Sequence, residues 1–407
     1  MVVYLGQFIS EKIRDERGLP TLNAAGTNRM HRVAQAIRDA EADCVIVSPG
    51  ASCRMAWKGV WFHKASVTRS EGVPVCLASA LGVPFVSAGW ALFSTLALVV
   101  SLHRRHGVSG VVVYNYRMIE FLVATVARWM LRVPVLLDLE DVSIPKLTDL
   151  KSGGIESFFR QIWCGFMMGM TLRVCHAVFA PTSRFRSVLP HGKKFEVLDG
   201  CMRIPALLSG EPETACASIS AERPLTLLFS GKIEFEHGVD VLAKAILSID
   251  MMQNAHNYHF HICGGGSALE WLRRELFKVQ QVNVFIHGFV SNCLFRQIFD
   301  QAEVCLVLQK PDGRHSFFKT PSKGYEALCA GKTLVVSNIG DFGMLPASVC
   351  RVVDPLNEES LVEAIKTLTR EDVRRYGKHA LAHARTRWDS AVVGRRIVGM
   401  MASAVDE

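Results

Sequence analysis

The sequence predicts an α/β protein with two tandem, doubly wound, Rossmann-like domains and a cleft between them. The length of 407 residues suits two or three domains. Apolar, strand-like runs alternate with helix-like stretches along the chain, which is typical of a mainly parallel sheet covered on both faces. The alternation stops near residues 203–222, where Ser, Glu, Pro and Ala predominate and indicate a linker. We therefore expect domains at residues 1–205 and 206–385.

Each expected domain repeats a strand–helix unit. In the first, strands are expected at 2–6, 43–48, 110–114, 133–139, 177–182 and 195–200, and helices at 28–40, 88–105, 118–131 and 155–173. In the second, strands are expected at 225–231, 258–264, 282–288, 304–309, 333–337 and 349–353, and helices at 239–250, 268–279, 292–300, 321–330, 358–368 and 371–385. Ligands should bind at the carboxyl ends of these strands and in the cleft.

The net charge of +8 is concentrated in the first half of the chain. Residues 1–205 contain 24 Lys and Arg against 15 Asp and Glu, whereas residues 206–407 contain 22 against 23. A basic half is typical of proteins that meet nucleic acid, an anionic membrane or a phosphorylated substrate. Scattered solubilising charge gives the same composition, so four interpretations remain open.

Cysteine usage and hydropathy indicate the compartment. Twelve cysteines lie singly, without the spacing of zinc ligands, which favours free thiols in a reducing compartment.

The first residues lack a basic region followed by a long apolar one, so we expect no signal peptide. Residues 72–102 lack Asp, Glu, Lys and Arg, but prolines and glycines divide them. We interpret them as short strands and one apolar helix rather than a membrane span.

A strand, a turn and a helix at residues 229–246 form a candidate anion site. Gly231 lets the backbone turn closely, and Lys232 and His237 follow it before the helix. Cations beside the free N–H groups of a helix start favour a bound anion. An ordinary strand–helix turn with two solvated cations fits the same residues, and the motif alone does not decide between them.

Three consecutive glycines, Gly264, Gly265 and Gly266, follow a later strand and precede a helix. They do not match the G-x-G-x-x-G dinucleotide fingerprint, which also needs an acid about twenty residues later. A nicotinamide-dependent dehydrogenase is therefore not favoured. Bare backbone at these glycines would still admit a ligand.

The stretch FFKTPSKGYEALCAGKTLVVS at residues 317–337 predicts a helix followed by a strand, with Thr320 as the helix N-cap. Lys323 does not help this helix, because a cation near the amino end is unfavourable by ~0.3–1 kcal/mol. Glu326 shares a face with Ser322 and Lys323. Two interpretations remain for the carboxylate: a surface Lys–Glu pair, or an acceptor of hydrogen bonds from a ribose diol.

The order of these motifs resembles the carboxyl-terminal half of a retaining GT-B glycosyltransferase of the large family four, glycosyl transferases group 1. The motifs are SGK…EHGVDVL, HICGGG, VFIHGFVS, AEVCLVLQ, TPSKGYEALCAGKTLVVSNIGD and VVDPLNEESLVEAI. The first half resembles the family's acceptor domain more loosely, through VLLDLED and HAVFAPTSRFRSVL…FEVLDGCM. TRWDSAVVGRRIVGMM is similar to the family's last helix, so residues 386–407 are expected to cross back to the first domain.

The resemblance implies roles for residues at matching positions. Donor binding is implied for Gly231, Lys232, His237, Gly264, Gly265, Gly266, Phe289, Val290, Lys319, Thr320, Ser322, Lys323 and Glu326. Acceptor binding is implied for Gly26, Asn28, Glu140 and Asp141, and catalytic roles for Glu140, Asp141, Lys232 and His237. Glu326 would bind the donor ribose, and Lys232 and His237 the pyrophosphate. The donor would be a UDP- or GDP-sugar, with no cofactor and no metal.

The chain departs from the family pattern at three positions. The first Glu of the family's Glu-x7-Glu falls on Phe318, which cannot accept a hydrogen bond. An Arg and a Lys of the pattern are replaced by Lys232 and His237. The pyrophosphate site is therefore weaker, or relies on Lys323. A Pro-Ser-Lys branch of the family also lacks the first Glu, and the chain resembles that branch.

The basic first half fits an acceptor domain that faces a membrane. Helix 155–173 carries a stripe of apolar residues, which is more typical of a helix that faces the core than of membrane contact. Lys146, Lys151, Arg104 and Arg105 lie near it in the sequence. We expect a cytoplasmic protein held peripherally at an anionic membrane, with a glycan or polyprenyl-diphosphate-linked acceptor and no nucleic-acid partner.

The leading hypothesis is a nucleotide-sugar-dependent hexosyltransferase that transfers with retention in polysaccharide or glycoconjugate biosynthesis. Glycosyl transfer passes through an oxocarbenium-like transition state, and cations near the leaving pyrophosphate would stabilise its charge. Two alternatives remain. One is a non-catalytic nucleotide-sugar-binding scaffold, which Phe318 and His237 motivate. The other is a nucleotide-sugar epimerase on the same fold, whose product would be a free epimer.

Overall fold

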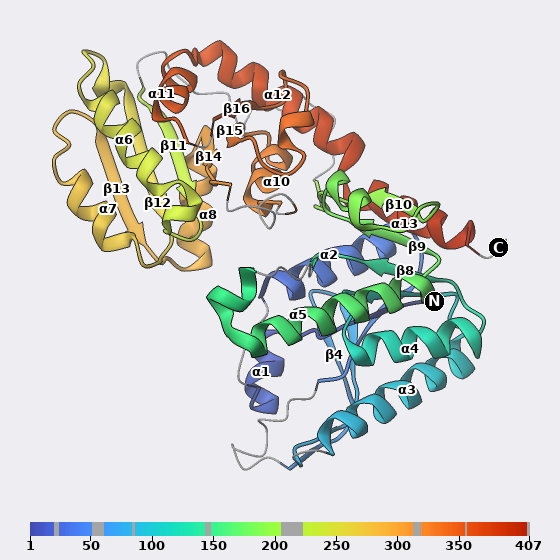
Figure 1. Ribbon diagram of the computed structural model, residues 1–407. Helices are drawn as coiled ribbons and strands as arrows, with labels where there is room; N and C mark the ends of the chain where they lie inside the picture. Colours follow the sequence, from blue (N-terminus) through green and yellow to red (C-terminus); the bar gives the residue numbers. More distant parts are fainter. Residues whose placement is uncertain are drawn as a thin grey trace. The chain divides into compact units, whose positions relative to one another are not determined.

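The computed structural model describes residues 1–19, 24–50, 61–83, 86–142, 148–204, 223–311, 318, 320–354 and 356–404. The chain divides into two compact units, one formed by Met1–Arg203 with Asp389–Glu407 (unit 1) and one by Ile204–Trp388 (unit 2). Each unit contains one large, mainly parallel sheet with helices packed on it (Figure 1). The predicted α/β class with two Rossmann-like sheets is therefore confirmed, while the cleft between them stays a prediction.

Unit 1 is built on an eight-stranded sheet with the order β10-β9-β8-β7-β1-β2-β5-β4. The strands are β1 (Val2–Leu5), β2 (Cys44–Ser48), β4 (Ser66–Ser70), β5 (Val73–Leu77), β7 (Gly110–Tyr114), β8 (Val135–Asp138), β9 (Ala177–Ala180) and β10 (Lys194–Val197). Neighbouring strands are parallel except β4 and β5. Strands β1, β2, β7, β8 and β9 are buried along their whole length, which explains their continuous apolar sequences.

Helices cover both faces of this sheet. They are α1 (Glu11–Arg17), α2 (Ala24–Asp39), α3 (Ser87–His106), α4 (Met118–Trp129), α5 (Thr148–Val174) and α13 (Ser390–Ala402), with a 3-10 turn η2 (Ser183–Val188). Helices α2 and α13 share one core cluster with alternate residues of the strands. Helices α3, α4 and α5 lie side by side on the opposite face (Figure 1). The last helix therefore packs in unit 1, on α2.

Two regions of unit 1 differ from the sequence-based expectation. Residues 62–70 form β3 (Phe62–His63) and β4, which were not expected, whereas β5, β6 (Ala80–Leu81) and α3 agree with the short strands and apolar helix expected at residues 72–102. Strand β3 pairs with β6, and β4 with β5. Helix α5 begins at Thr148, and its Phe159, Ile162, Trp163 and Phe166 are exposed. The expectation that this stripe faces the core is therefore wrong for these four side chains, whereas Met167 of the same stripe is buried. Among the described residues, no helix is long and apolar enough to cross a membrane.

Unit 2 is built on a six-stranded, all-parallel sheet with the order β13-β12-β11-β14-β15-β16. The strands are β11 (Leu225–Ser230), β12 (Tyr258–Cys263), β13 (Asn283–Gly288), β14 (Val304–Val307), β15 (Thr333–Ser337) and β16 (Arg351–Val353). The helices are α6 (Val239–Asp250), α7 (Leu269–Leu276), α8 (Asn292–Gln301), α10 (Ser322–Cys329), α11 (Glu358–Lys366) and α12 (Arg370–Arg387). Short 3-10 turns are η3 (Phe235–His237), η4 (Ala255–Asn257) and η5 (Phe342–Met344).

The strand orders determine where ligands can bind. In unit 2 the chain starts at β11, adds β12 and β13 on one side, and then adds β14, β15 and β16 on the other. In unit 1 the same reversal separates β1 from β7. Loops from the carboxyl ends of the two central strands diverge at such a reversal and leave a crevice between them. The two candidate sites are therefore expected beside β1 and β7 and beside β11 and β14.

The contact between α2 and α13 gives a direct test of the fold. A Cβ atom at Gly394 would lie 1.9 Å from the carbonyl oxygen of Ala36, whereas one at Gly399 would meet nothing within 4 Å. Gly394→Ala should therefore destabilise unit 1 by about 1–3 kcal/mol, because α13 must move away from α2. Gly399→Ala, the same change five residues further on, should stabilise it by ~0.5–1 kcal/mol. Denaturant unfolding measures both, and equal effects would contradict the close contact.

Candidate functional site

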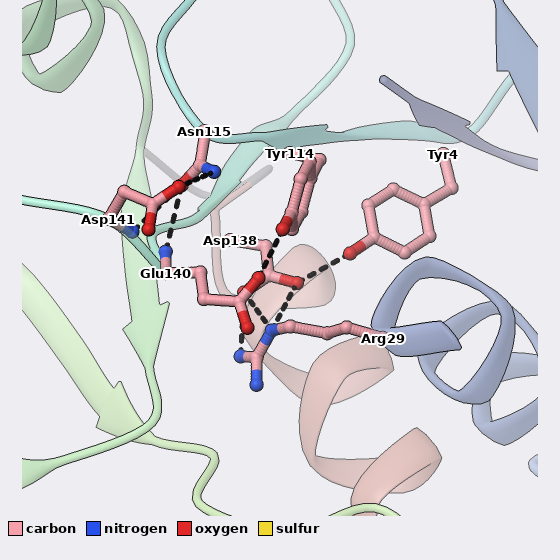
Figure 2. A network of polar contacts seen from close by, with 7 residues as sticks. All are labelled: Tyr4, Arg29, Tyr114, Asn115, Asp138, Glu140 and Asp141. Atoms are coloured by element: carbon pink, nitrogen blue, oxygen red, sulfur yellow. Dashed lines mark hydrogen bonds and ion pairs between the residues drawn. The ribbon is translucent and has the colours of Figure 1, made fainter. Parts of the chain in front are cut away.

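The first cluster of polar side chains lies at the carboxyl ends of three neighbouring strands of unit 1 (Figure 2). Tyr4 is on β1, Tyr114 ends β7 and Asp138 ends β8. Tyr114 and Asp138 are register partners, so these two strands end at the same level. Glu140 and Asp141 follow β8 directly, which brings the two predicted carboxylates to the crevice beside β1 and β7.

A buried ion pair forms the base of this cluster. The Arg29 guanidinium donates to both Asp138 carboxylate oxygens, with Nη2–Oδ1 at 2.7 Å and Nε–Oδ2 at 3.0 Å. The Tyr4 hydroxyl also donates to Asp138 Oδ2. Asp138 is fully buried, and a buried carboxylate needs such partners to offset its lost hydration. Burial, and then the neighbouring Asp138 charge, raise the pKa of the Tyr4 hydroxyl, so it remains a donor.

Asn115 and Tyr114 hold the two predicted carboxylates in place. Asn115 Oδ1 accepts from the backbone N–H groups of Glu140 and Asp141, at 2.9 and 3.1 Å. Asn115 Nδ2 donates to Asp141 Oδ2 at 3.0 Å, and the Tyr114 hydroxyl donates to Glu140 Oε2. Asn115 has a φ of +58°, a left-handed conformation that asparagine tolerates better than most residues. One asparagine thus orients the whole segment after β8.

The electrostatics of Glu140 follow from its position. Burial raises its pKa above the ordinary 4.5, and the nearby Asp138 and Asp141 charges act in the same direction. The Arg29 charge and the Tyr114 hydrogen bond oppose this increase only in part. Glu140 therefore holds a proton more readily than a solvated glutamate, while its backbone position is fixed.

The other residues predicted for acceptor binding lie at the start of α2. Gly26 is buried and Asn28 is exposed, and Arg29 follows Asn28 directly. The same helix therefore reaches the carboxylate cluster through Arg29. The sequence did not indicate Arg29, Tyr4, Tyr114 or Asn115. Asn115 could have been recognised from the sequence, because it directly follows a buried apolar strand, where polar side chains often bind ligands.

In unit 2 the predicted glycines bring two turns into contact. Gly231 follows β11 and Gly264 follows β12, with φ values of +138° and +140°. A Cβ at Gly264 would lie 1.7 Å from the Gly231 carbonyl oxygen, and one at Gly266 would lie 2.3 Å from that of Ile233. Ile233 N–H donates to the Gly265 carbonyl at 3.0 Å. Side chains at positions 264 and 266 are thus excluded, and the turns present bare backbone at the carboxyl edge.

Glu234, which the sequence did not indicate, fastens the same two turns. Its carboxylate accepts from the backbone N–H of Ser267 at 2.9 Å and from the Ser267 hydroxyl. The hydroxyl, the backbone N–H and, more weakly, the charges of His237 and Lys232 lower the pKa of Glu234. A carboxylate therefore lies beside the two predicted cations and offsets part of their charge.

The predicted cations Lys232 and His237 follow β11. Lys232 is exposed, and His237 ends η3 just before α6. His237 Nε2 lies 3.4 Å from Glu236 Oε1. Both side chains are at the reversal of strand order, so their predicted position at an anion is consistent with the fold.

The residues after β13 present an open aromatic surface. Phe289 is 93% exposed and follows Gly288, whose φ is +69°. Val290 is half-buried against a small cluster of Leu228, Cys263 and Ile298. Val290 therefore anchors the segment, and Phe289 remains available to a ligand at the carboxyl end of β13.

The start of α10 differs in detail from the expectation. The N-cap is Pro321, without a side-chain cap hydrogen bond, and not Thr320. The reason is the extended ψ of 106° at Pro321, which postpones the first helical turn to Ser322. Phe318 is half-buried, and Lys319 lies outside the described residues.

Lys323 and Glu326 form the Lys–Glu ion pair that was one of the two interpretations of the sequence. Lys323 Nζ lies 2.8 Å from Glu326 Oε2 and 4.8 Å from the ring centroid of Phe295 on α8. The Lys–Glu pair is therefore confirmed, and the ring of Phe295 also holds the ammonium group. Binding of a ribose diol by Glu326 stays a prediction. No group of three or more His, Cys, Asp or Glu suited to a metal ion occurs within the described ranges.

Comparisons with known proteins agree with this architecture. Residues 224–371 match the family model of glycosyl transferases group 1, whereas no curated protein matches the chain. Sucrose-phosphate synthase from Thermosynechococcus elongatus superposes with a TM-score of 0.62 at 12% identity, covering 99% of this chain and 98% of that one. A glycosyltransferase from Rickettsia africae also gives 0.62 at 12%, covering 100% and 98%. Starch synthase IV from Arabidopsis thaliana gives 0.63 at 11%, covering 100% and 99%.

These findings define the fold. The two parallel sheets form the GT-B fold of glycosyltransferases, and the structural neighbours extend over nearly the whole chain. Unit 2 contains a glycosyl transferases group 1 domain.

The two touching turns give a matched test in unit 2. Gly264→Ala should destabilise it by about 1–3 kcal/mol or more, because the new Cβ meets the Gly231 carbonyl and the positive φ is strained. Gly265→Ala meets nothing within 4 Å and should change stability by less than about 0.5 kcal/mol. Denaturant unfolding of both variants measures the difference. Similar stabilities would show that the turns do not touch.

The position of Glu140 predicts a pH dependence of stability. The pKa of Glu140 is higher in the folded protein than its ordinary value of 4.5. Its contribution to the free energy of unfolding is therefore fully present below pH 4.5 and is lost as the pH rises through the folded-state pKa. Glu140→Gln should therefore match the wild type in acid and exceed its melting temperature at neutral pH. Melting curves from about pH 4 to about pH 8 test this. A constant difference across that range would refute burial as the cause.

Proposed function

We propose that the chain is a retaining hexosyltransferase of family four, in its Pro-Ser-Lys branch, that transfers a sugar from a UDP- or GDP-sugar to a glycan or lipid-linked acceptor. The reaction would serve polysaccharide or glycoconjugate biosynthesis at the cytoplasmic face of a membrane. The observation that carries this proposal is the glycosyl transferases group 1 match over the unit whose bare-backbone turns, cations and Glu326 occupy one sheet edge.

The donor is proposed to lie along the carboxyl edge of unit 2. Gly264 and Gly266 let the two turns touch, and a diphosphate would lie against the backbone at Gly231 and Gly265, where a Cβ would meet nothing within 4 Å. Lys232 and His237 would lie beside it, with α6 beginning just beyond. Phe289 would contact the base. Two structural neighbours support a nucleotide ligand, since they are described as bound to ADP and to UDP-2-fluoro glucose.

The acceptor is proposed to lie at the carboxylate cluster of unit 1. Glu140 and Asp141 are held by Asn115 and can accept hydrogen bonds from sugar hydroxyl groups. Arg29 is bound in its pair with Asp138 and keeps a positive charge beneath them. Gly26 and Asn28 would contribute from the start of α2.

The proposed mechanism is electrostatic. As the glycosidic bond to the diphosphate breaks, negative charge grows on the leaving group, and Lys232, His237 and Lys323 would stabilise it more in the transition state than before. Glu326 and the Phe295 ring hold the Lys323 ammonium group at the start of α10, and the Glu326 carboxylate offsets part of its charge. Retention is proposed by analogy with a neighbour, trehalose-6-phosphate synthase, whose description states glycosyl transfer with retention.

Two measurements test this function. A thermal-shift panel of nucleotide diphosphates and nucleotide sugars should show stabilisation by one base family. A transfer assay with that donor and a polyprenyl-diphosphate sugar should then yield a glycoside whose anomeric configuration matches the donor. Binding without any transfer would support the scaffold, and release of a free epimer would support the epimerase.

Glu326 provides a specific prediction. Glu326→Ala should raise the nucleotide-sugar Kd roughly 10–100-fold, because hydrogen bonds to a charged group contribute about 1.5–3 kcal/mol. Glu363→Ala is the matched control, since Glu363 forms another Lys–Glu pair three residues apart, with Lys366 on α11. It should leave the Kd unchanged. Calorimetry measures both values, and an unchanged Kd for Glu326→Ala would exclude the ribose role.

A further inference from the structure

The helical layer of unit 1 exposes large apolar side chains. They are Phe93 on α3, Met118 on α4, and Phe159, Ile162, Trp163 and Phe166 on α5, between 43% and 65% exposed, with Trp129 (66%) and Met130 (75%) at the carboxyl end of α4. The four on α5 recur at the spacing of one helix face, and the Trp163 and Phe166 rings lie 5.9 Å apart. Exposed apolar side chains that gather on one face usually mark an interaction surface.

The positions of Met118 and Trp163 along the layer can be compared. Each of the three helices leads from the carboxyl end of a strand back to the next parallel strand, so all run in the same direction. Arg128 donates to the Val174 carbonyl, which places the ends of α4 and α5 together. Met118 and Trp163 each precede the last residue of their helix by eleven positions. They are therefore level with each other, at the edge where Asn115 holds Asp141.

Most charged residues of α3 and α4 and of the segments that follow them are basic. Residues 87–137 contain the bases Arg104, Arg105, Arg117, Arg128 and Arg132. Their only acid is Glu120, which is 2% exposed. On α5, Arg160 and Arg173 are exposed together with Glu156. Arg117 and Arg160 are thus near the apolar side chains in sequence, while Arg104, Arg105, Arg128 and Arg173 lie at the carboxyl ends of the three helices. The layer as a whole is therefore mainly basic, which is complementary to a negatively charged surface.

We propose that this face, from Phe93 across Met118 to the α5 residues Phe159, Ile162, Trp163 and Phe166, docks on an anionic lipid bilayer. Aromatic side chains enter the headgroup boundary, and arginines attract anionic lipids. The carboxylate cluster then lies at the membrane surface, where a lipid-linked acceptor would arrive. Only this last step rests on the proposed function, because docking itself needs no donor or transfer.

Vesicle flotation of the full chain tests the docking. Phosphatidylcholine vesicles containing phosphatidylglycerol should bind it, phosphatidylcholine alone should bind it less, and added salt should weaken binding. The double variant Trp163→Ser with Phe166→Ser should lower partitioning roughly tenfold or more. Phe277→Ser is the matched control, since Phe277 is 91% exposed but lies in unit 2, and it should leave partitioning unchanged. Arg160→Glu should lower it about fivefold or more.

Fluorescence quenching tests which surface of the protein contacts the lipid. Brominated lipids should quench tryptophan fluorescence of the wild type, and Trp163→Phe should keep vesicle binding but lose part of the quenching. Phe159→Ser with Ile162→Ser replaces the first double variant if that one does not fold. Absence of vesicle binding, or binding that none of these changes reduces, overturns the proposal. Lipid-independent self-association that the double variant abolishes would also overturn it, because a second copy would then cover the face.

The result separates docking from the proposed function. Transfer to a water-soluble acceptor without vesicle binding would refute the docking and keep the transferase. Aromatic-dependent vesicle binding without nucleotide binding or transfer would keep the docking and refute the transferase.

Discussion

In a parallel sheet, the chain must cross back to the starting edge after every strand. This constraint governs both units. Each return needs a helix across a face of the sheet, so every loop that leaves a strand's carboxyl end lies at the same edge. Where the strand order reverses, beside β1 and β11, these loops separate. The carboxylate cluster and the glycine turns occur at these two places. The same returns also produce the layer of α3, α4 and α5, with its exposed face.

The two sites differ in how they place polar groups next to a hydrophobic core. In unit 1, the half-buried Arg29 pairs with the fully buried Asp138, and Asn115 positions Glu140 and Asp141 through backbone hydrogen bonds. In unit 2, glycines remove side chains so that two turns can touch, and Glu234 fastens them at Ser267. The first arrangement supplies fixed carboxylates, whereas the second supplies exposed backbone. Sugar hydroxyls and phosphates respectively suit these surfaces.

The sequence predicted the elements well where apolar runs are continuous, as in β7, because strands that are buried on both faces are mostly apolar. Gly264 and Glu326 could be found from local motifs. Arg29 could not, because its partner Asp138 is distant in the sequence and only the sheet brings them together. The exposed face of α5 was also missed. An apolar stripe has the same spacing whether it meets a core or a membrane, and only packing against α4 and β8 distinguishes them.

The last helix has a consequence for synthesis. Val393, Ile397 and Met401 of α13 belong to the same buried cluster as Val2 and Tyr4 of β1. The Ser390 N–H donates to the Met202 carbonyl at 2.9 Å, so the chain leaves and re-enters unit 1 at adjacent points. Unit 2 is thus a continuous insertion between two parts of unit 1. The core cluster around β1 can therefore be completed only after the whole of unit 2 has been synthesised, because α13 follows unit 2 in the chain.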